Sequence, residues 1–161
     1  MTVDSLIAHA ESTASTHYYL LLSLLDLSSD TLSHAASHLG IAHCISTLLR
    51  ALPFHASKGR MVIPAEITAK HGVSQEEVFR KGPASKGIDD SVFELATIAN
   101  DHIVTAREMF GGKVPRVAMP IFGAGASYFF FGTGITANPI FGTDTDCLFL
   151  GEATRRGLQR L

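Results

Sequence analysis

The chain has 161 residues, of which 46% are hydrophobic and 17% charged, so its length and composition favour one compact domain with a single core. Thirteen basic and fifteen acidic residues give a formal net charge of −2, which supplies no broad cationic field and argues against nucleic-acid binding. Its two cysteines, Cys44 and Cys147, form neither a metal-ligand pattern nor a disulfide framework, which favours a reducing compartment.

Residues 4–27 are predicted to form one long helix. They contain neither Gly nor Pro, and their apolar side chains recur at helical spacing. These positions are Leu6, Ile7, Ala10, Ala14, Tyr18, Leu21, Leu22 and Leu25.

No targeting or membrane-spanning segment is expected in this chain. Residues 1–11 carry acids and a helical pattern, and they lack both the arginine-rich composition of a transit peptide and the basic-then-apolar order of a secretion signal. The longest apolar runs, 18–25 and 128–131, are much shorter than the roughly 20 residues that span a bilayer.

A second helix is predicted to begin at residues 28–30, whose side-chain oxygens can cap its first amides, and to stop at Pro53. Its apolar stripe alternates steps of three and four residues. The stripe consists of Leu32, Ala35, Leu39, Ala42, Ile45, Leu49 and Leu52. Small residues at Ala36, Ser37 and Gly40 allow a neighbouring helix to come close, so this helix is expected at the centre of a bundle.

Two short helices are predicted in the connection that follows. Pro64 can open the first, which runs to about residue 70 and ends at Gly72. Ser74 and Glu77 form a capping box for the second, over residues 75–80.

A third long helix is predicted after a loop at residues 82–87. Its apolar seam consists of Ile88, Val92, Leu95, Ala99, Ile103 and Ala106. Residues 115–122 could form one more helix, but seven glycines within 111–142 argue against regular structure there.

The histidines and the first cysteine suggest two alternative sites. His34 and His38 lie four residues apart on one helical face and could share a zinc ion, but no third ligand follows at a telling spacing. Cys44 with His43 or His38 could form a nucleophilic pair, although a cysteine inside a helix is more often a small hydrophobe. Structural roles are therefore the favoured interpretation for all four residues.

Two features of the C-terminal part are less specific. Gly123 and Gly125, with Gly132 and Gly134, superficially suggest a phosphate-binding loop, but no strand precedes them and no Lys-Ser/Thr pair accompanies them. The aromatic run at 128–131 fits a membrane or partner contact and a buried core equally well.

Residues 39–66, LGIAHCISTLLRALPFHASKGRMVIPAE, carry an ordered set of elements: Leu-Gly-x-Ala at 39–42, Gly-Arg at 59–60 and Pro-x-Glu at 64–66. This order resembles the second signature of the squalene/phytoene synthase family. The resemblance implies an all-α fold, a partial isoprenoid-synthase-like helical bundle with an irregular C-terminal tail. We expect residues 1–126 to form the helical domain and residues 127–161 a divergent tail of unassigned role.

In active members of that family, two aspartates one helical turn apart bind the magnesium ions that hold a prenyl diphosphate. The resemblance places Ala51 and His55 at these positions, and it implies that the chain has no catalytic residues, metal site or cofactor. If a remnant pocket survives, Arg50 and Arg60 are its groups most able to meet an anion. The predicted remnant pocket consists of Cys44, Thr47, Arg50, Ala51, His55 and Arg60.

Residues 8–15, 34–55, 71–82 and 89–107 also resemble a mitochondrial member of the family that acts without catalysis in the assembly of respiratory complex I. This resemblance implies complex I subunits or assembly intermediates as partners, on the matrix side of the inner membrane, with peripheral contact to that membrane as a further possibility. It also implies further N-terminal helices and a transit peptide, so the sequence is expected to be a fragment or a truncated gene model. The alternatives are a prenyltransferase that condenses isoprenoid diphosphates and a prenyl-lipid binding module.

Overall fold

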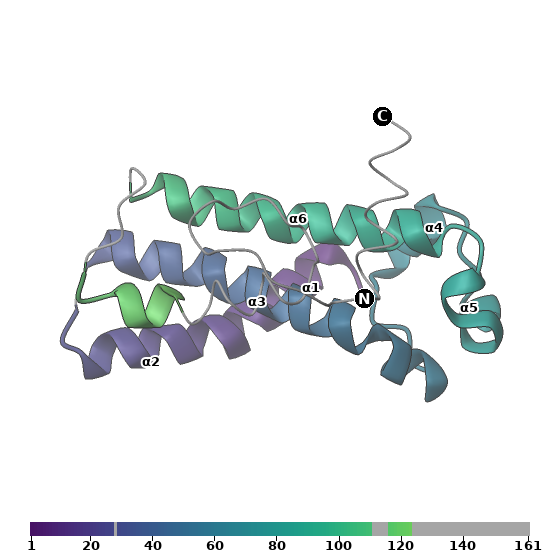
Figure 1. Ribbon diagram of the computed structural model, residues 1–161, viewed down its shortest axis with the longest axis horizontal. Coiled ribbons are helices and arrows are strands. Elements are labelled where there is room, and N and C mark those ends of the chain that lie inside the picture. Colours follow the sequence, from purple (N-terminus) through teal and green to yellow (C-terminus); the bar gives the residue numbers. More distant parts are fainter. Residues whose placement is uncertain (28, 111–115, 124–161) are drawn as a thin grey trace, which may run out of the picture.

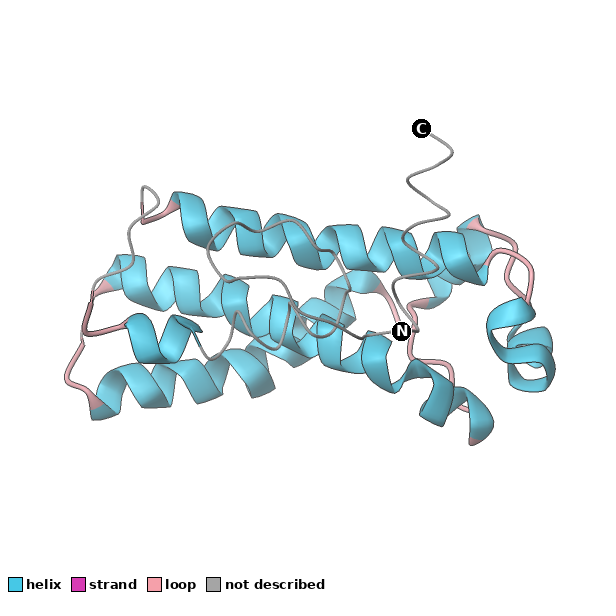
Figure 2. Ribbon diagram, in the orientation of Figure 1, coloured by secondary structure: helices cyan, strands magenta, loops and turns pink. Residues whose placement is uncertain are grey.

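The computed structural model describes residues 1–27, 29–110 and 116–123, and the regular elements in those ranges are all helical (Figure 1; Figure 2). They are α1 (Val3–Ala10), the π-helical turn η1 (Glu11–Ser15), α2 (Thr16–Leu24), α3 (Asp30–Ser57), α4 (Ala65–Lys70), α5 (Gln75–Lys81), the 3-10 turn η2 (Gly82–Ala84), α6 (Ile88–Glu108) and a short helical segment at 119–123. The prediction of an all-α bundle is confirmed. The tail predicted at 127–161 lies outside the described residues.

The N-terminal helix begins and ends close to its predicted bounds. The hydroxyl of Thr2 accepts a hydrogen bond from the Ser5 N–H at 3.1 Å, which caps the first turn of α1. The Val3 N–H donates to the carboxylate of Glu66, so the start of α1 is tied to α4. α2 ends at Leu24, and Asp26 adopts a positive φ of 54° in the turn toward α3.

A π-helical turn inside this helix changes which side chains are buried. The turn adds a residue to one helical repeat, so the buried face passes from Ala10 to Ser15, while Ala14 is only half-buried. The turn crosses α3 at Gly40, where a Cβ would lie 2.4 Å from Ser15 Oγ and 2.5 Å from Ser15 Cα. Glycine at position 40 is therefore what allows the two backbones to approach this closely.

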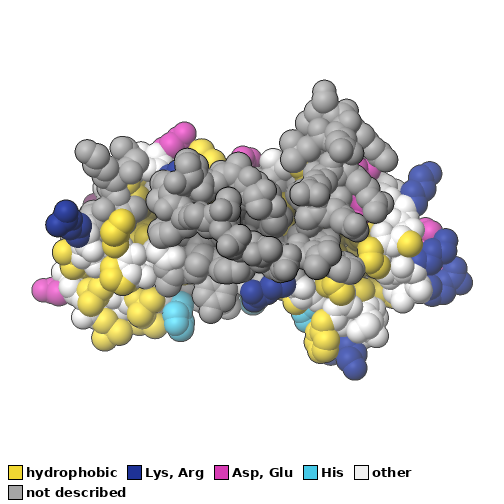
Figure 3. Space-filling view, viewed as in Figure 1, with side chains coloured by type: hydrophobic (Ala, Val, Ile, Leu, Met, Phe, Trp, Pro, Cys, Tyr) yellow, Lys and Arg dark blue, Asp and Glu magenta, His cyan; other side chains and the backbone are white. Residues whose placement is uncertain are grey.

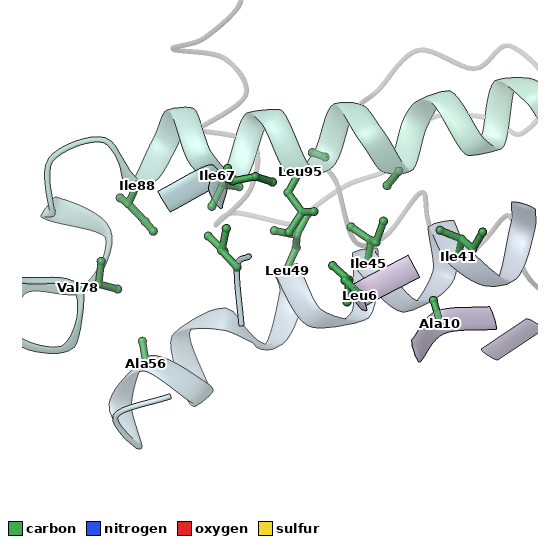
Figure 4. Packing of buried hydrophobic residues seen from close by; sticks show 14 residues of the cluster. Leu6, Ala10, Ile41, Ile45, Leu49, Ala56, Ile67, Val78, Ile88 and Leu95 are labelled. Atoms are coloured by element: carbon green, nitrogen blue, oxygen red, sulfur yellow. The ribbon is translucent and has the colours of Figure 1, made fainter. Parts of the chain in front are cut away.

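The central helix α3 does not end at Pro53, so that prediction is wrong. The helix continues to Ser57, and its ribbon changes direction between Leu49 and Ala56 (Figure 4). Pro53 has no N–H to donate to the carbonyl of Leu49, and its ring crowds that carbonyl, which explains the bend. Because Ala56 is buried in an apolar cluster, tertiary packing carries the helix past the proline. At the other end, Ser29 occupies the N-cap without a side-chain capping bond.

Two apolar clusters hold the bundle together, and α3 and α6, which make its most extensive helix contact, contribute to both. The first cluster includes Leu6, Ile41, Ile45, Leu49, Ile67, Val78, Ile88 and Leu95 (Figure 4). The second includes Tyr18, Leu22, Leu32, Leu39, Ala106, Ile121 and Phe122. The helical segment at 119–123 thus covers the second cluster, in partial agreement with the helix predicted at 115–122.

The short helices and α6 match their predicted positions. α4 follows Pro64, and α5 follows Ser74, whose hydroxyl accepts the Glu77 N–H at 3.4 Å. Gly87 precedes α6 with a φ of 78°, and a Cβ there would lie 2.4 Å from the carbonyl oxygen of His71. Among the described helices, none combines the length and the apolar character needed to cross a bilayer.

Candidate functional site

The residues predicted to form a remnant pocket lie on one side of α3 and in the turn after it. The four residues on its common helical face are Cys44, Thr47, Ala51 and His55, at steps of three and four residues, and all are half-buried. The two arginines, Arg50 and Arg60, are exposed, and no ion pair within the described ranges involves either of them. The Arg60 N–H donates to the carbonyl of His55 at 2.9 Å, which brings the turn back against the end of the helix.

The residues that the family resemblance places at the aspartate positions do not fit a magnesium ion. Ala51 offers a methyl group and His55 an imidazole, whereas magnesium prefers oxygen ligands in octahedral geometry. Pro53 lies between them and bends the helix that would have to align two ligands one turn apart. Across the described part of the chain, no three His, Cys, Asp or Glu side chains are arranged to hold a metal ion.

Cys44 has the surroundings of a small apolar side chain rather than those of a nucleophile. It packs against the first apolar cluster, and burial raises the pKa of its thiol, which disfavours the reactive thiolate. The neighbouring His43 hydrogen-bonds through Nδ1 to the Tyr18 hydroxyl at 2.8 Å. Burial lowers the pKa of His43, and the nearby positive charge of Arg50 lowers it further.

A polar layer, consisting of Glu11, Tyr19, Ser37, His38 and His102, lies near the boundary between the two apolar clusters. The Glu11 carboxylate accepts hydrogen bonds from the Tyr19 hydroxyl and, at 2.7 Å, from the Ser37 hydroxyl. His38 on α3 meets His102 on α6, with 2.7 Å between their Nδ1 atoms, so one Nδ1 must carry the hydrogen that the other accepts. The sequence did not predict this layer, because its members come from three separate helices.

The charge states of the polar layer follow from its surroundings. Burial lowers the pKa of His38, and the neighbouring His102 and His34 lower it further. Burial likewise lowers the pKa of His102. Burial alone would raise the pKa of Glu11, but hydrogen bonds from Tyr19 and Ser37 hold it below its ordinary value. The layer therefore favours neutral imidazoles beside an ionised carboxylate.

The His34 and His38 pair suggested by the sequence is only a ring contact, with 5.0 Å between ring centroids. The ring centroid of His102 is also 5.0 Å from that of His38, but only His102 brings its Nδ1 within hydrogen-bond distance of His38. Of the four glycines that suggested a phosphate loop, Gly123 ends the helical segment at 119–123. The other three glycines and the aromatic run at 128–131 lie outside the described residues.

A cavity of about 200 Å³ opens between the C-terminal end of α3, α5 with η2, and the start of α6. Ala56, Val78 and Ile88, one from each of these helices, point into the same space (Figure 4). None of the six residues of the predicted remnant pocket lines it. Asp89 does line it, and it is the only charged side chain among the described residues that do. The cavity thus lies on a different face of α3 from the remnant pocket.

Comparison with known proteins places the chain in a family. A family model described as squalene/phytoene synthase matches residues 1–140, and the chain therefore belongs to the squalene/phytoene synthase family. The match extends beyond residue 126, where the sequence placed the end of the helical domain. Residues 127–140 are not among those described, so the domain boundary stays a prediction.

The curated relatives carry a single name. The chain is 38% identical over 121 residues to "NADH dehydrogenase (ubiquinone) complex I, assembly factor 6" of Rattus norvegicus, covering 75% of this chain and 36% of that protein. It is 40% identical over 114 residues to the Homo sapiens protein of the same name, covering 71% of this chain and 34% of the relative. The Drosophila melanogaster homolog is 38% identical over 121 residues, 75% of this chain and 36% of its own. The chain thus spans about a third of the length of these relatives, and no solved structure matches it significantly.

Proposed function

We propose that this chain acts without catalysis, as a binding protein in the assembly of respiratory complex I. The observation that carries the proposal is the donor set on α3: the family resemblance places Ala51 and His55 at the two positions where active members hold magnesium with aspartates, and neither side chain supplies an oxygen ligand. The name of the curated relatives supports the same role, because they are complex I assembly factors at 38–40% identity.

The proposed partners are complex I subunits or assembly intermediates. The corresponding location is the mitochondrion, on the matrix side of the inner membrane, with peripheral contact to that membrane. In this proposal, the remnant pocket no longer performs chemistry, and its exposed arginines, Arg50 and Arg60, are free to meet an anionic group of a partner or of a lipid.

The alternative, a prenyltransferase that condenses isoprenoid diphosphates, is not favoured. It needs a magnesium clamp that Ala51 and His55 do not supply, and the relatives are named for assembly rather than for prenyl transfer. A prenyl-lipid binding module would keep an apolar pocket without the reaction, and lipid bound to the purified chain would reveal it.

Affinity purification of the tagged full chain from mitochondria tests the proposal. We expect complex I subunits or intermediates to co-purify, and their consistent absence would count decisively against it. In parallel, the purified chain incubated with farnesyl or geranylgeranyl diphosphate and Mg²⁺ should give no prenylated product. Turnover in that assay would replace the proposal with the prenyltransferase alternative.

A further inference from the structure

The cavity between α3, α5 and α6 has the size of one side chain. Its volume of about 200 Å³ lies below the roughly 300–1,000 Å³ typical of pockets for drug-sized ligands. Its walls are apolar, with Leu52 and Ala56 from α3 and Val78 and Phe79 from α5. A pocket of this size and lining suits one large apolar side chain, the kind of anchor that contributes most of the energy at protein interfaces.

The negative charge of Asp89 at the cavity determines which charged residue of a partner can lie beside the inserted side chain. Asp89 lies at its wall, half-buried, and no ion pair within the described ranges involves it. A lysine or arginine next to the inserted side chain would meet this carboxylate, whereas a phosphate or carboxylate would be repelled.

The cations near the cavity do not cancel this preference. Figure 3 shows Lys and Arg side chains gathered at the end of the molecule formed by α5. Within α5, Lys81 pairs with Glu77 at 2.8 Å and Arg80 with Glu76 at 3.8 Å. Lys86, three residues before Asp89, is exposed and forms no ion pair with it within the described ranges, so the Asp89 carboxylate stays available to a partner.

The alternative is that Asp89 has a structural role only. Asp89 and Asp90 both lie in the first turn of α6, where acidic side chains stabilise the helix N-terminus. Asp90 is exposed and does not line the cavity, so it can serve the helix as well as Asp89 does. Substitutions of Asp89 and Asp90 are therefore a matched pair: each removes one negative charge from the first turn of α6, but only the Asp89 variant changes the cavity.

We propose that this cavity is the docking site for a partner protein, and that it receives one large apolar side chain whose neighbouring lysine or arginine pairs with Asp89. The inference rests on the proposed function, because it names the chemistry of the complex I subunit or intermediate that the chain would bind. It assigns this recognition to a face of α3 separate from the remnant pocket.

Photo-crosslinking of the full chain in mitochondria tests the docking site directly. The probe, p-benzoylphenylalanine, replaces either Ser57, which lines the cavity, or the exposed neighbour Lys58, which does not. We expect position 57 to link to an apolar residue with a Lys or Arg within one helical turn, at a yield roughly fivefold above that from position 58.

Charge reversal supplies the second arm of the test. Asp89→Lys should lower the yield from position 57 roughly fivefold, Asp90→Lys should change it by less than about twofold, and replacing the partner's basic residue by Glu should restore the Asp89→Lys yield. Thermal melts of both variants report whether each one folds. Three outcomes would each overturn the inference: equal effects of the two charge reversals, a crosslink to lipid, and no crosslink from position 57 while complex I subunits co-purify. Absence of co-purified complex I subunits would instead refute the proposed function.

Discussion

Replacing Gly40 by alanine tests the close crossing of η1 over α3. The added Cβ would lie 2.4 Å from Ser15 Oγ, 2.5 Å from Ser15 Cα and 2.6 Å from Ser15 N. Carbon atoms in contact normally stay about 3.5–4.0 Å apart, so the two backbones must separate by about 1 Å. Because two of the three clashing atoms belong to the backbone, rotation of the Ser15 side chain cannot relieve the overlap.

The size of the effect follows from two opposing contributions. Overpacking of a close contact costs about 3 kcal/mol at the upper end of its usual range. Alanine inside a helix is more favourable than glycine by about 1 kcal/mol, which offsets part of that cost. The net loss in the free energy of unfolding is therefore about 2 kcal/mol, or a fall in Tm of about 4–8 °C for a chain of this size.

Urea and thermal unfolding of the full chain, followed by circular dichroism, measure this loss. Gly123→Ala is the control, because a Cβ there has open space; at the end of the helical segment it should leave stability unchanged or raise it by up to about 1 kcal/mol. Adding Ser15→Gly to Gly40→Ala should rescue little, since the Cα and N contacts remain. A Gly40→Ala variant as stable as the native chain would refute the close crossing.

Three further predictions concern the polar layer and one helix cap. Glu11→Ala removes the acceptor for the Tyr19 and Ser37 hydroxyls, so the free energy of unfolding should fall by about 1–3 kcal/mol; an unchanged urea midpoint would contradict this role. The pKa values of His38 and His102 are lowered in the folded chain, so the unfolded chain binds protons more readily. The free energy of unfolding should therefore fall as the pH drops below about 6.5, and His102→Gln should make that fall shallower. An identical pH profile for the variant would contradict a contribution of His102. Ser74→Ala should cost about 1 kcal/mol in chemical unfolding through loss of the α5 cap, and no measurable change would mean that water replaces the hydroxyl.

Most of the helices could be predicted because their signals are local. Periodic apolar residues, the Ser74 cap and the glycines that precede or follow helices act within a few residues, and the structure places α4, α5 and α6 close to the predicted bounds. The end predicted at Pro53 was wrong because it depends on a contact distant in the sequence. The packing of Ala56 in the first cluster outweighs the missing hydrogen bond, and no local pattern predicts that packing.

The candidate sites could be predicted only in part. The family resemblance implied that Cys44, Ala51 and His55 belong to one site, and their spacing places them on one face of α3. The apolar pattern did not predict the π-helical turn, because Ala14 falls on the buried face of a regular helix. The turn shifts that face, so that Ser15 is buried instead. The cavity and the polar layer depend on contacts between residues far apart in the chain, which periodicity does not encode.

The polar layer also restricts how the helices can be aligned along their axes. Sliding α3 by one turn, about 5.4 Å, past the N-terminal helix would take Ser37 away from Glu11 and place that carboxylate opposite apolar side chains such as Ile41. Glu11 would keep the Tyr19 hydroxyl, which lies on its own helix, but lose the Ser37 donor. Loss of that hydrogen bond costs about 1–3 kcal/mol, whereas the apolar side chains above and below would tolerate the shift far better. A bundle stabilised mainly by Leu, Ile and Ala contacts could settle into neighbouring alignments of similar energy. One carboxylate that faces a hydroxyl donor on the neighbouring helix favours one of them.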